Sequence, residues 1–114
     1  MTSRSYCPKR GDVVWLSFAP QAGHEQAGHR PALTLSPEAY NHKAGLALFC
    51  PITTQIKGYP FEVPVPVGLK ASGVVLADQV KNLDWRARSA KFCCRIPDAA
   101  VAEVLQKLNI LLDA

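Results

Sequence analysis

Residues 46–55 read LALFCPITTQ, and this stretch decides the fold that the sequence predicts. Its apolar and β-branched residues are typical of a strand, but Pro51 has no backbone N–H to donate to a neighbouring strand. We therefore expect a strand that bends or bulges at Pro51, just before Thr53 and Thr54. A bend re-aims the side chains beside it, so the threonine pair is a candidate for a functional site.

Two further strands are predicted on the N-terminal side of this stretch. Residues 12–18 (DVVWLSF) are dense in β-forming residues and are apolar on both faces. Residues 30–36 (RPALTLS) form the second strand, with Pro31 at its first positions or on an edge, because proline cannot donate to a ladder. The segment 19–29 between them contains Pro, Gly, His and Glu without periodicity, which indicates a surface loop of a length that often carries function.

Two helices are predicted. Residues 37–43 can form a single turn, with Ser36 as the N-cap and Gly45 near its end. Pro97 and Asp98 open a longer helix, whose apolar residues fall on one stripe that packs on the sheet or on a partner. The stripe consists of Val101, Val104, Leu105, Leu108, Leu111 and Leu112.

The remaining strands are short. Residues 61–67 alternate apolar and polar positions, and Pro64 and Pro66 restrict this strand to a sheet edge. Further strands are expected at 74–77, 79–83 and 92–96. Many short strands with Gly and Pro turns, followed by one helix, predict a mainly β fold of the α+β type: a strongly bent antiparallel sheet or small barrel with helices outside.

Length, charge and cysteines narrow the functional class. The 114 residues suit one domain, 1–114, without a separate cofactor module, so no cofactor is expected. A net charge of +4 mildly favours an anionic partner such as nucleic acid. The four cysteines form no CxxC pair and have no zinc-finger spacing to a histidine, so we expect no metal site and free thiols, with Cys93 and Cys94 on opposite faces of a strand.

The compartment is predicted from the same features. Free thiols fit a reducing cytoplasm. Residues 1–10 contain no apolar leader core, and no run approaches the roughly 20 apolar residues of a membrane span. We therefore expect a cytoplasmic protein that starts at Met1 and makes no contact with a membrane.

The loop before the second strand carries the residues best suited to chemistry. Cleaving RNA without a metal requires a proton acceptor, a proton donor and groups that stabilise a crowded, negatively charged phosphorane. Arg30 suits a clamp on phosphate oxygens, and the hydroxyl of Thr53 can donate to one of them. Glu25 or His29 is then the natural acid or base, although His29 and Arg30 face opposite sides if the strand is regular.

A second set of residues can contact RNA outside the reacting phosphate. Phe18 and Tyr59 can stack on bases, Lys57 can hold a phosphate, and Gln79 next to Asp78 can read a base edge. Each aromatic can equally be a packing residue. The segment 81–91 adds a basic patch, which suits a nucleic-acid backbone but also a solvated rim or an acidic partner; its cations are Lys81, Arg86, Arg88 and Lys91.

Four blocks in order resemble one family: GDVVWLSF, GHEQAGHRPALTLSPEAYN, CPITTQIKGYPFEV and GVVLADQVKNLDWRAR. Together, over about residues 11–88, they are similar to the MazF/PemK toxin endoribonucleases. The resemblance implies an SH3-like barrel, a homodimer and metal-independent cleavage of single-stranded RNA, chiefly mRNA. In the closest branch the cleavage motif contains an ACA triplet, and the products carry a 2′,3′-cyclic phosphate and a 5′-hydroxyl. The resemblance also implies a small MazE-like antitoxin, whose acidic disordered tail covers the toxin's site and arrests its inhibition of translation and growth.

The resemblance also assigns residues. The family's arginine falls on Arg30 and its threonine on Thr53, while Glu25 matches an acidic loop position. Phe18 and Gln79 match RNA-contacting positions. We add three further RNA contacts to these predictions, namely Asn41, Lys57 and Arg86. The chain departs from the family at Pro64, Pro66 and the FCCR stretch of residues 92–95, which affects an edge and a linker.

Two other functions remain open at this point. One is a gyrase poison of related fold, which binds a protein and cleaves nothing. The other is a non-catalytic RNA-binding module, for which the basic patch and the aromatic residues suffice. Neither alternative requires Glu25, Arg30 and Thr53 together.

Overall fold

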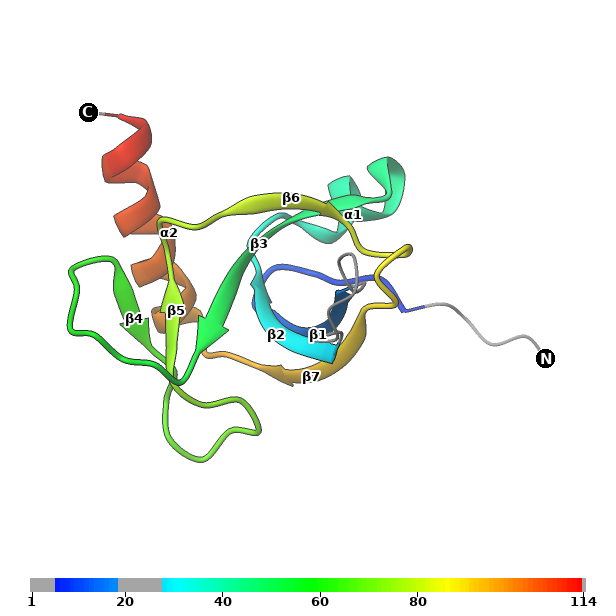
Figure 1. The fold of residues 1–114 in the computed structure, drawn as a ribbon. Coiled ribbons are helices and arrows are strands. Elements are labelled where there is room, and N and C mark those ends of the chain that lie inside the picture. Colours follow the sequence, from blue (N-terminus) through cyan, green and yellow to red (C-terminus); the bar gives the residue numbers. More distant parts are fainter. Residues whose placement is uncertain (1–5, 19–27, 114) are drawn as a thin grey trace, which may run out of the picture.

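The computed structural model describes residues 6–18 and 28–113, with Phe18 described in its backbone only. Seven strands and two helices follow one another along the chain (Figure 1). The strands are β1 (Asp12–Phe18), β2 (Gly28–Thr34), β3 (Leu46–Thr53), β4 (Glu62–Pro64), β5 (Val74–Leu76), β6 (Lys81–Asp84) and β7 (Lys91–Arg95). The helices are α1 (Glu38–Ala44), which lies between β2 and β3 in the chain, and α2 (Asp98–Leu112) at the C-terminal end.

All strand pairings are antiparallel, in the order β4-β5-β3-β2-β1-β7, and β6 pairs with β3 beside that path. The two strands at the ends of the path, β4 and β7, do not pair with each other, so the described strands form an open, bent sheet. The predicted mainly β fold with a C-terminal helix is confirmed, whereas the closure of the sheet into a barrel is not. The expected edge position of the proline-containing fourth strand is also confirmed.

The strand β3 changes its neighbours at Pro51. Up to this residue β3 pairs with β2 and β6, and its last two residues, Ile52 and Thr53, pair with β5 instead. The ladders of β3 keep their registers, so the expected bulge is absent and a change of partner takes its place. Because β2 and β3 separate after Pro51, the end of β3 is free to turn toward β5, as Figure 1 shows.

Side chains are buried on both faces of the sheet, as the two-sided apolar pattern of β1 predicts. One cluster lies between the sheet and α2, and it contains Val13, Leu33, Cys50, Ile52, Val63, Val75, Ile96, Val101 and Val104 among its members. The second cluster lies on the other face and contains Val14, Leu16, Ala32, Ala47, Phe49 and Trp85. Alternation along β1 divides Val13 from Val14 in this way.

The helix ends differ in part from the prediction. Helix α1 begins after Pro37, and no side chain caps it. Ser36 is therefore not its N-cap, because its hydroxyl donates to Asn41 Oδ1 and accepts from the Leu48 amide at 2.8 Å. Gly45 ends α1 as predicted, with a left-handed φ of 73°. In α2, Val101 and Val104 are buried while the last apolar residues, Ile110, Leu111 and Leu112, are exposed.

Strand β7 carries a bulge that the sequence does not reveal. Val13 pairs with Cys94 and Val14 with Phe92, so Cys93 is the extra residue between them. The bulge interrupts the alternation expected for the two cysteines, and their Sγ atoms lie 3.8 Å apart. Neither thiol is in a disulfide, and Cys7 and Cys50 are free as well.

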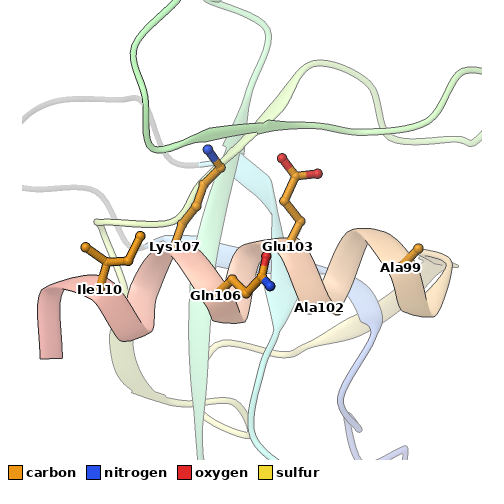
Figure 2. A pocket seen from close by; sticks show the side chains of 6 residues that line it. All are labelled: Ala99, Ala102, Glu103, Gln106, Lys107 and Ile110. Carbon is orange, nitrogen blue, oxygen red and sulfur yellow. The ribbon is translucent and has the colours of Figure 1, made fainter. Parts of the chain in front are cut away.

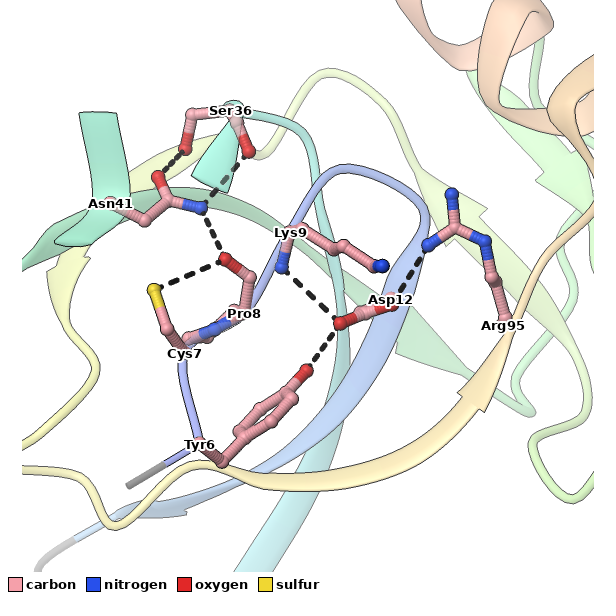
Figure 3. Close-up of polar contacts among 8 residues, drawn as sticks. All are labelled: Tyr6, Cys7, Pro8, Lys9, Asp12, Ser36, Asn41 and Arg95. Atoms are coloured by element: carbon pink, nitrogen blue, oxygen red, sulfur yellow. Dashed lines mark hydrogen bonds and ion pairs between the residues drawn. The ribbon is translucent and has the colours of Figure 1, made fainter. Parts of the chain in front are cut away.

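A buried carboxylate joins the start of β1 to the end of β7 (Figure 3). Asp12 is 2% exposed, and its Oδ1 accepts from the Arg95 guanidinium at 2.9 Å. Its Oδ2 accepts from the Tyr6 hydroxyl and from the Lys9 amide. Both carboxylate oxygens thus have donors, which lowers the cost of burying the carboxylate.

Neither α1 nor α2 is long and apolar enough to cross a membrane, and no other helix occurs in the described part of the chain.

Candidate active site

Arg30 and Thr53 lie at matching positions of neighbouring strands. The last pair of the β2–β3 ladder is Ala32 with Pro51, and two residues further on each strand stand Arg30 and Thr53. Because side chains alternate along a strand, both residues belong to the sheet face of Ala32 and Pro51. The β2–β3 ladder ends at Ala32 and Pro51, and Thr53 pairs with Val74 of β5 instead. The two residues predicted to form the centre of the site therefore share a sheet face, beyond the last β2–β3 pair.

Thr53 is the last residue of β3 and is half-buried. Its Oγ1 accepts a hydrogen bond from the Gln55 amide at 3.1 Å. This contact uses an oxygen lone pair and leaves the hydroxyl hydrogen available to a ligand. Arg30 is exposed on the paired strand, opposite Leu16 of β1. A fixed hydroxyl donor and an exposed guanidinium are groups that can stabilise a charged phosphate.

The backbone of Thr53 rests against Gly73. A Cβ atom on Gly73 would lie 2.0 Å from the Thr53 carbonyl oxygen, and the glycine has a φ of +111°, which other residues rarely adopt. Gly73 also accepts a hydrogen bond from the Val65 amide at 2.9 Å. The sequence did not predict this role of Gly73. The only available signal was a single glycine before a short apolar strand, which is typical of many turns.

His29 does not share a face with Arg30. Strand β2 is regular here, with His29 opposite Ser17 and Arg30 opposite Leu16, so the two side chains point to opposite sides of the sheet. Of the two residues, Arg30 is the one that shares the sheet face of Thr53 by alternation along the strands. Glu25, the other predicted acid or base, lies outside the described residues.

The segment 54–61, which joins β3 to β4 and is called the 54–61 loop below, carries Lys57. Its conformation is held by Glu62, whose two carboxylate oxygens accept from the amides of Lys57 and Gly58, each at 2.9 Å. The Lys57 residue is exposed. Glu62 is another residue that sequence analysis missed, because a glutamate in an alternating edge strand has no distinctive pattern.

Gln79 is exposed in the turn that joins β5 to β6, called the 77–80 turn below. Its amide donates to the Leu76 carbonyl at 3.1 Å. The neighbouring Asp78 accepts a hydrogen bond from the Tyr59 hydroxyl at 2.5 Å, so the turn is joined to the 54–61 loop. Lys57 and Gln79 therefore lie on two segments that contact each other near the end of β3.

Arg86 lies at the other end of β3. It follows β6, which pairs with the beginning of β3, and its guanidinium donates to the His42 carbonyl at 3.4 Å and stacks 4.5 Å above the Trp85 ring. At about 3.3 Å per residue, the seven steps from Leu46 to Thr53 span roughly 23 Å. Arg86 cannot reach a phosphate held by Thr53, so it can only contact a distant part of a longer ligand.

Asn41 is a structural residue, and its predicted contact with RNA is wrong. Its side chain is 0% exposed. The Nδ2 atom donates to the carbonyls of Pro8 at 2.8 Å and Ser36 at 3.0 Å, while Oδ1 accepts from the Ser36 hydroxyl (Figure 3). The amide links the N-terminal segment to the start of α1. The backbone of Phe18 pairs with Gly28, and its side chain lies outside the description.

The basic patch of residues 81–91 forms the surface around β6. Lys81, Arg86 and Lys91 are exposed and Arg88 is half-buried, whereas Trp85 is only 3% exposed and donates through Nε1 to the Asn41 carbonyl. Trp85 thus belongs to the second cluster and does not offer a ring face for base stacking.

A shallow hollow lies along α2, and it includes none of the predicted site residues (Figure 2). It is lined by Ala99, Ala102, Glu103, Gln106, Lys107 and Ile110. Within residues 6–18 and 28–113, no three His, Cys, Asp or Glu side chains are grouped closely enough to hold a metal ion.

The fold is similar to that of MazF from Deinococcus radiodurans, whose crystal structure superposes with a TM-score of 0.86 at 55% identity, covering 96% of this chain and 100% of that one. The chain belongs to the family of PemK-like, MazF-like toxins of type II toxin-antitoxin systems, whose model matches residues 9–112. The family predicted from the sequence is therefore confirmed.

Individual relatives agree with this assignment. The endoribonuclease toxin MazF of Escherichia coli K12 is 50% identical over 112 residues, which cover 98% of this chain and 99% of that protein. The endoribonuclease PemK of Escherichia coli is 35% identical over 109 residues, which cover 91% of this chain and 81% of that protein. A crystal structure of MazE-MazF from Deinococcus radiodurans superposes with a TM-score of 0.91 at 56% identity, covering 95% of this chain and 97% of that one. The chain is thus a member of a family of endoribonuclease toxins.

Proposed function

We propose that this chain is a metal-independent endoribonuclease that cuts single-stranded RNA, chiefly messenger RNA, at a short motif containing ACA. The observation that supports the proposal most directly is that Arg30 and Thr53 belong to one face of the sheet, each two residues beyond the last β2–β3 pair. The endoribonuclease names of the relatives support the same activity.

The reaction is a transesterification within the RNA. The 2′-oxygen attacks the adjacent phosphorus and loses its proton to a base, while the bond from phosphorus to the 5′-oxygen breaks and this oxygen receives a proton. The products are a 2′,3′-cyclic phosphate and a 5′-hydroxyl, so no water is consumed and no redox partner is needed. Catalysis then depends on stabilising the extra negative charge of the phosphorane and on the two proton transfers.

Arg30 and Thr53 stabilise that charge. The guanidinium of Arg30 is exposed, and its planar fork of N–H groups serves as a bidentate donor to the non-bridging oxygens. The Thr53 hydroxyl is oriented by the Gln55 amide and donates its own hydrogen to a phosphate oxygen. Removing one such donor commonly costs about 10²- to 10³-fold in rate.

The proton acceptor in this proposal is Glu25. A carboxylate can accept the 2′-hydroxyl proton, and Glu25 stands five residues before Arg30 in the sequence. His29 is the weaker candidate because it faces the opposite side of β2 from Arg30. Outside the reacting phosphate we retain Phe18, Lys57, Gln79 and the more distant Arg86 as RNA contacts.

The biological setting is inferred from the relatives. The titles of two structures name complexes with an antitoxin, MazE-MazF from Deinococcus radiodurans and a mycobacterial endoribonuclease with its cognate antitoxin. We propose that an acidic MazE-like antitoxin tail covers the site of this chain, attracted by its net charge of +4. Free toxin then inhibits translation and growth in the cytoplasm, a compartment that suits its four free thiols.

We also propose a homodimer. The last turn of α2 exposes three neighbouring apolar residues, Ile110 at 60%, Leu111 at 48% and Leu112 at 75%. Apolar surface of this kind gains free energy when a second copy covers it.

The experiment that tests the function uses a long single-stranded RNA in excess EDTA, with the cut ends mapped by primer extension. Discrete cuts at one ACA-containing motif, absent with Arg30→Ala, would support a metal-independent, sequence-specific endoribonuclease. RNA bound but uncut would favour the non-catalytic module. RNA neither bound nor cut, while a related toxin remains active beside it, would favour the protein-binding poison.

A further inference from the structure

We propose that the hydrogen bond from Tyr59 to Asp78 is a tether that holds the two RNA-contacting segments in their binding geometry. This proposal rests on the proposed function. Tyr59 and Asp78 act as positioning residues, because they fix Lys57 and Gln79 relative to Thr53 and do not touch the reacting phosphate.

The tether lies beyond the paired base of the 54–61 loop. Backbone hydrogen bonds already join the base of the 54–61 loop to the 77–80 turn, since the Ala77 amide donates to the Phe61 carbonyl at 3.0 Å and Glu62 pairs with Leu76. Beyond that base, the side-chain bond between Tyr59 and Asp78 at 2.5 Å is a cross-link nearer the tip. It therefore restricts a part of the loop that the ladder does not reach.

The tether lies next to the residues that we propose it positions. Lys57 is two residues before Tyr59, and Gln79 directly follows Asp78. Thr53 ends β3 immediately before the same loop. Any movement of the loop tip changes the spacing between these three residues, and an ordered loop loses less conformational freedom when RNA binds.

Further contacts hold the segment around Tyr59 in place. Glu62 binds the Lys57 and Gly58 amides, and Lys107 of α2 donates to the Pro60 carbonyl at 2.6 Å, so the segment around Tyr59 is preorganised. Tyr59 also packs edge-on against Phe61, with ring centroids 6.5 Å apart. The hydrogen bond to Asp78 raises the pKa of the Tyr59 phenol, which remains a donor throughout the neutral range.

The tether contributes little to the stability of the fold. Tyr59 is 39% exposed, and a hydrogen bond at an exposed site adds little to the free energy of folding. Asp78 Oδ1 is buried and has no hydrogen-bond partner among the described residues, which is a cost to folding. A contact that adds little to the stability of the fold and joins two predicted RNA-binding segments is explained by binding geometry.

The test is the steady-state cleavage of a short single-stranded RNA containing the mapped motif. Tyr59→Phe and Asp78→Ala break the tether, whereas Asp78→Asn keeps an acceptor for the phenol. Tyr40→Phe is the matched control, because Tyr40 is 41% exposed and its hydroxyl also takes part in a hydrogen bond, accepting from Asn82 Nδ2 at 3.2 Å. Thermal unfolding of every variant accompanies the kinetics.

The expected result is a KM about fivefold higher for Tyr59→Phe and Asp78→Ala, the net worth of one hydrogen bond, with kcat within about twofold of the wild type. Asp78→Asn should restore most of the loss, and the double variant Tyr59→Phe/Asp78→Ala should be no worse than either single variant. Tyr40→Phe should behave as the wild type.

Two outcomes would overturn the tether. One is a Tyr59→Phe enzyme with the KM and cleavage pattern of Tyr40→Phe. The other is a loss confined to kcat that follows the thermal midpoint, which would mean a merely structural role. Failure of the proposed function looks different, because the wild type itself would then leave the RNA uncut, and that result would reject both proposals together.

Discussion

Gly73 faces the Thr53 carbonyl so closely that a single added Cβ atom would lie 2.0 Å from its oxygen. The contacting atom is backbone, so no side-chain rotation can relieve the overlap. The left-handed φ of +111° adds a second penalty for any other residue. The glycine, directly before β5, therefore allows the close approach that fixes the backbone of Thr53, the threonine proposed to be catalytic.

The first prediction follows from this contact. Gly73→Ala should displace the end of β3 and lower kcat by about tenfold or more, because a shift of about 1 Å in a positioned group can cost up to 100-fold. Thermal unfolding should show a loss of about 1–3 kcal/mol, in the range for a strained backbone position. Gly68→Ala is a suitable control, since Gly68 also has a positive φ, +96°, but nothing lies within 4 Å of an added Cβ. Equal activity in the two variants would contradict the supporting role of Gly73.

The second prediction concerns the threonine pair. Thr53→Val removes the hydroxyl and keeps the shape, so cleavage should fall by about 10²-fold or more if this hydroxyl donates to the phosphate. Thr54→Val changes the next residue, which is exposed and lies past the end of β3, and should leave the rate within a few fold of the wild type. Single-turnover cleavage at saturating enzyme measures the chemical step directly. Wild-type rates for Thr53→Val would reduce this residue to a packing role.

Local patterns predicted most of the elements, because strands and helices are encoded over a few neighbouring residues. The segment 12–18 is a strand with the predicted bounds, and Gly45 ends α1 as expected. The pairing of strands is encoded over long distances, so the sequence predicts a bend or bulge at Pro51 but not the change of partner that occurs there. The bulge at Cys93 was not expected at all, since nothing in FCCR distinguishes it from a regular strand.

Only part of the site could be predicted, because contacts between its residues also depend on pairing between distant parts of the chain. Arg30 and Thr53 are 23 residues apart, and only the register of β2 against β3 assigns them to the same face of the sheet. Asn41 was assigned to RNA because a polar residue on a short helix resembles a surface residue, but its amide satisfies two buried carbonyls and a hydroxyl. Such a role depends on Pro8, which is 33 residues away.

The third prediction tests the corrected role of Asn41. Asn41→Ala leaves the Pro8 and Ser36 carbonyls without their donor, so the free energy of unfolding should fall by about 2–4 kcal/mol. Denaturant unfolding measures this loss. RNA affinity of the folded fraction, and its dependence on salt, should stay unchanged, because no atom of the side chain is exposed.

Arg86→Ala should show the reverse behaviour. Its guanidinium is exposed, so the free energy of unfolding should change little. The slope of log Kd against log salt concentration should fall by about one, because one phosphate contact is lost. An Asn41→Ala protein that is fully stable but binds RNA poorly would return Asn41 to the binding surface.

The fourth prediction uses the buried thiol beneath the 77–80 turn. Cys50 is 0% exposed and its Sγ contacts the Ala77 carbonyl at 3.9 Å. Burial, and to a smaller extent the negative charge of Asp78, raise the pKa of the Cys50 thiol to about 12. In the unfolded chain the pKa of a cysteine is about 8.5. The folded state therefore favours the neutral thiol, and this contribution to stability is complete below about pH 8.5 and is lost as the pH rises toward 12.

Measurements of urea unfolding between pH 8 and 10.5 under reducing conditions isolate this group when the wild type is compared with Cys50→Ala. Other groups that titrate, such as Cys93 and Tyr6, are present in both proteins and cancel in the difference. The stability advantage of the wild type should shrink by up to about 1.4 kcal/mol per pH unit once the pH exceeds the unfolded pKa. In Asp78→Asn the folded pKa of Cys50 should be lower, because the charge that opposes its ionisation is gone, so the shrinkage should stop at a lower pH. A difference between wild type and Cys50→Ala that does not vary with pH would show that the thiol ionises equally in both states, and that Asp78 does not act on the core beneath the turn.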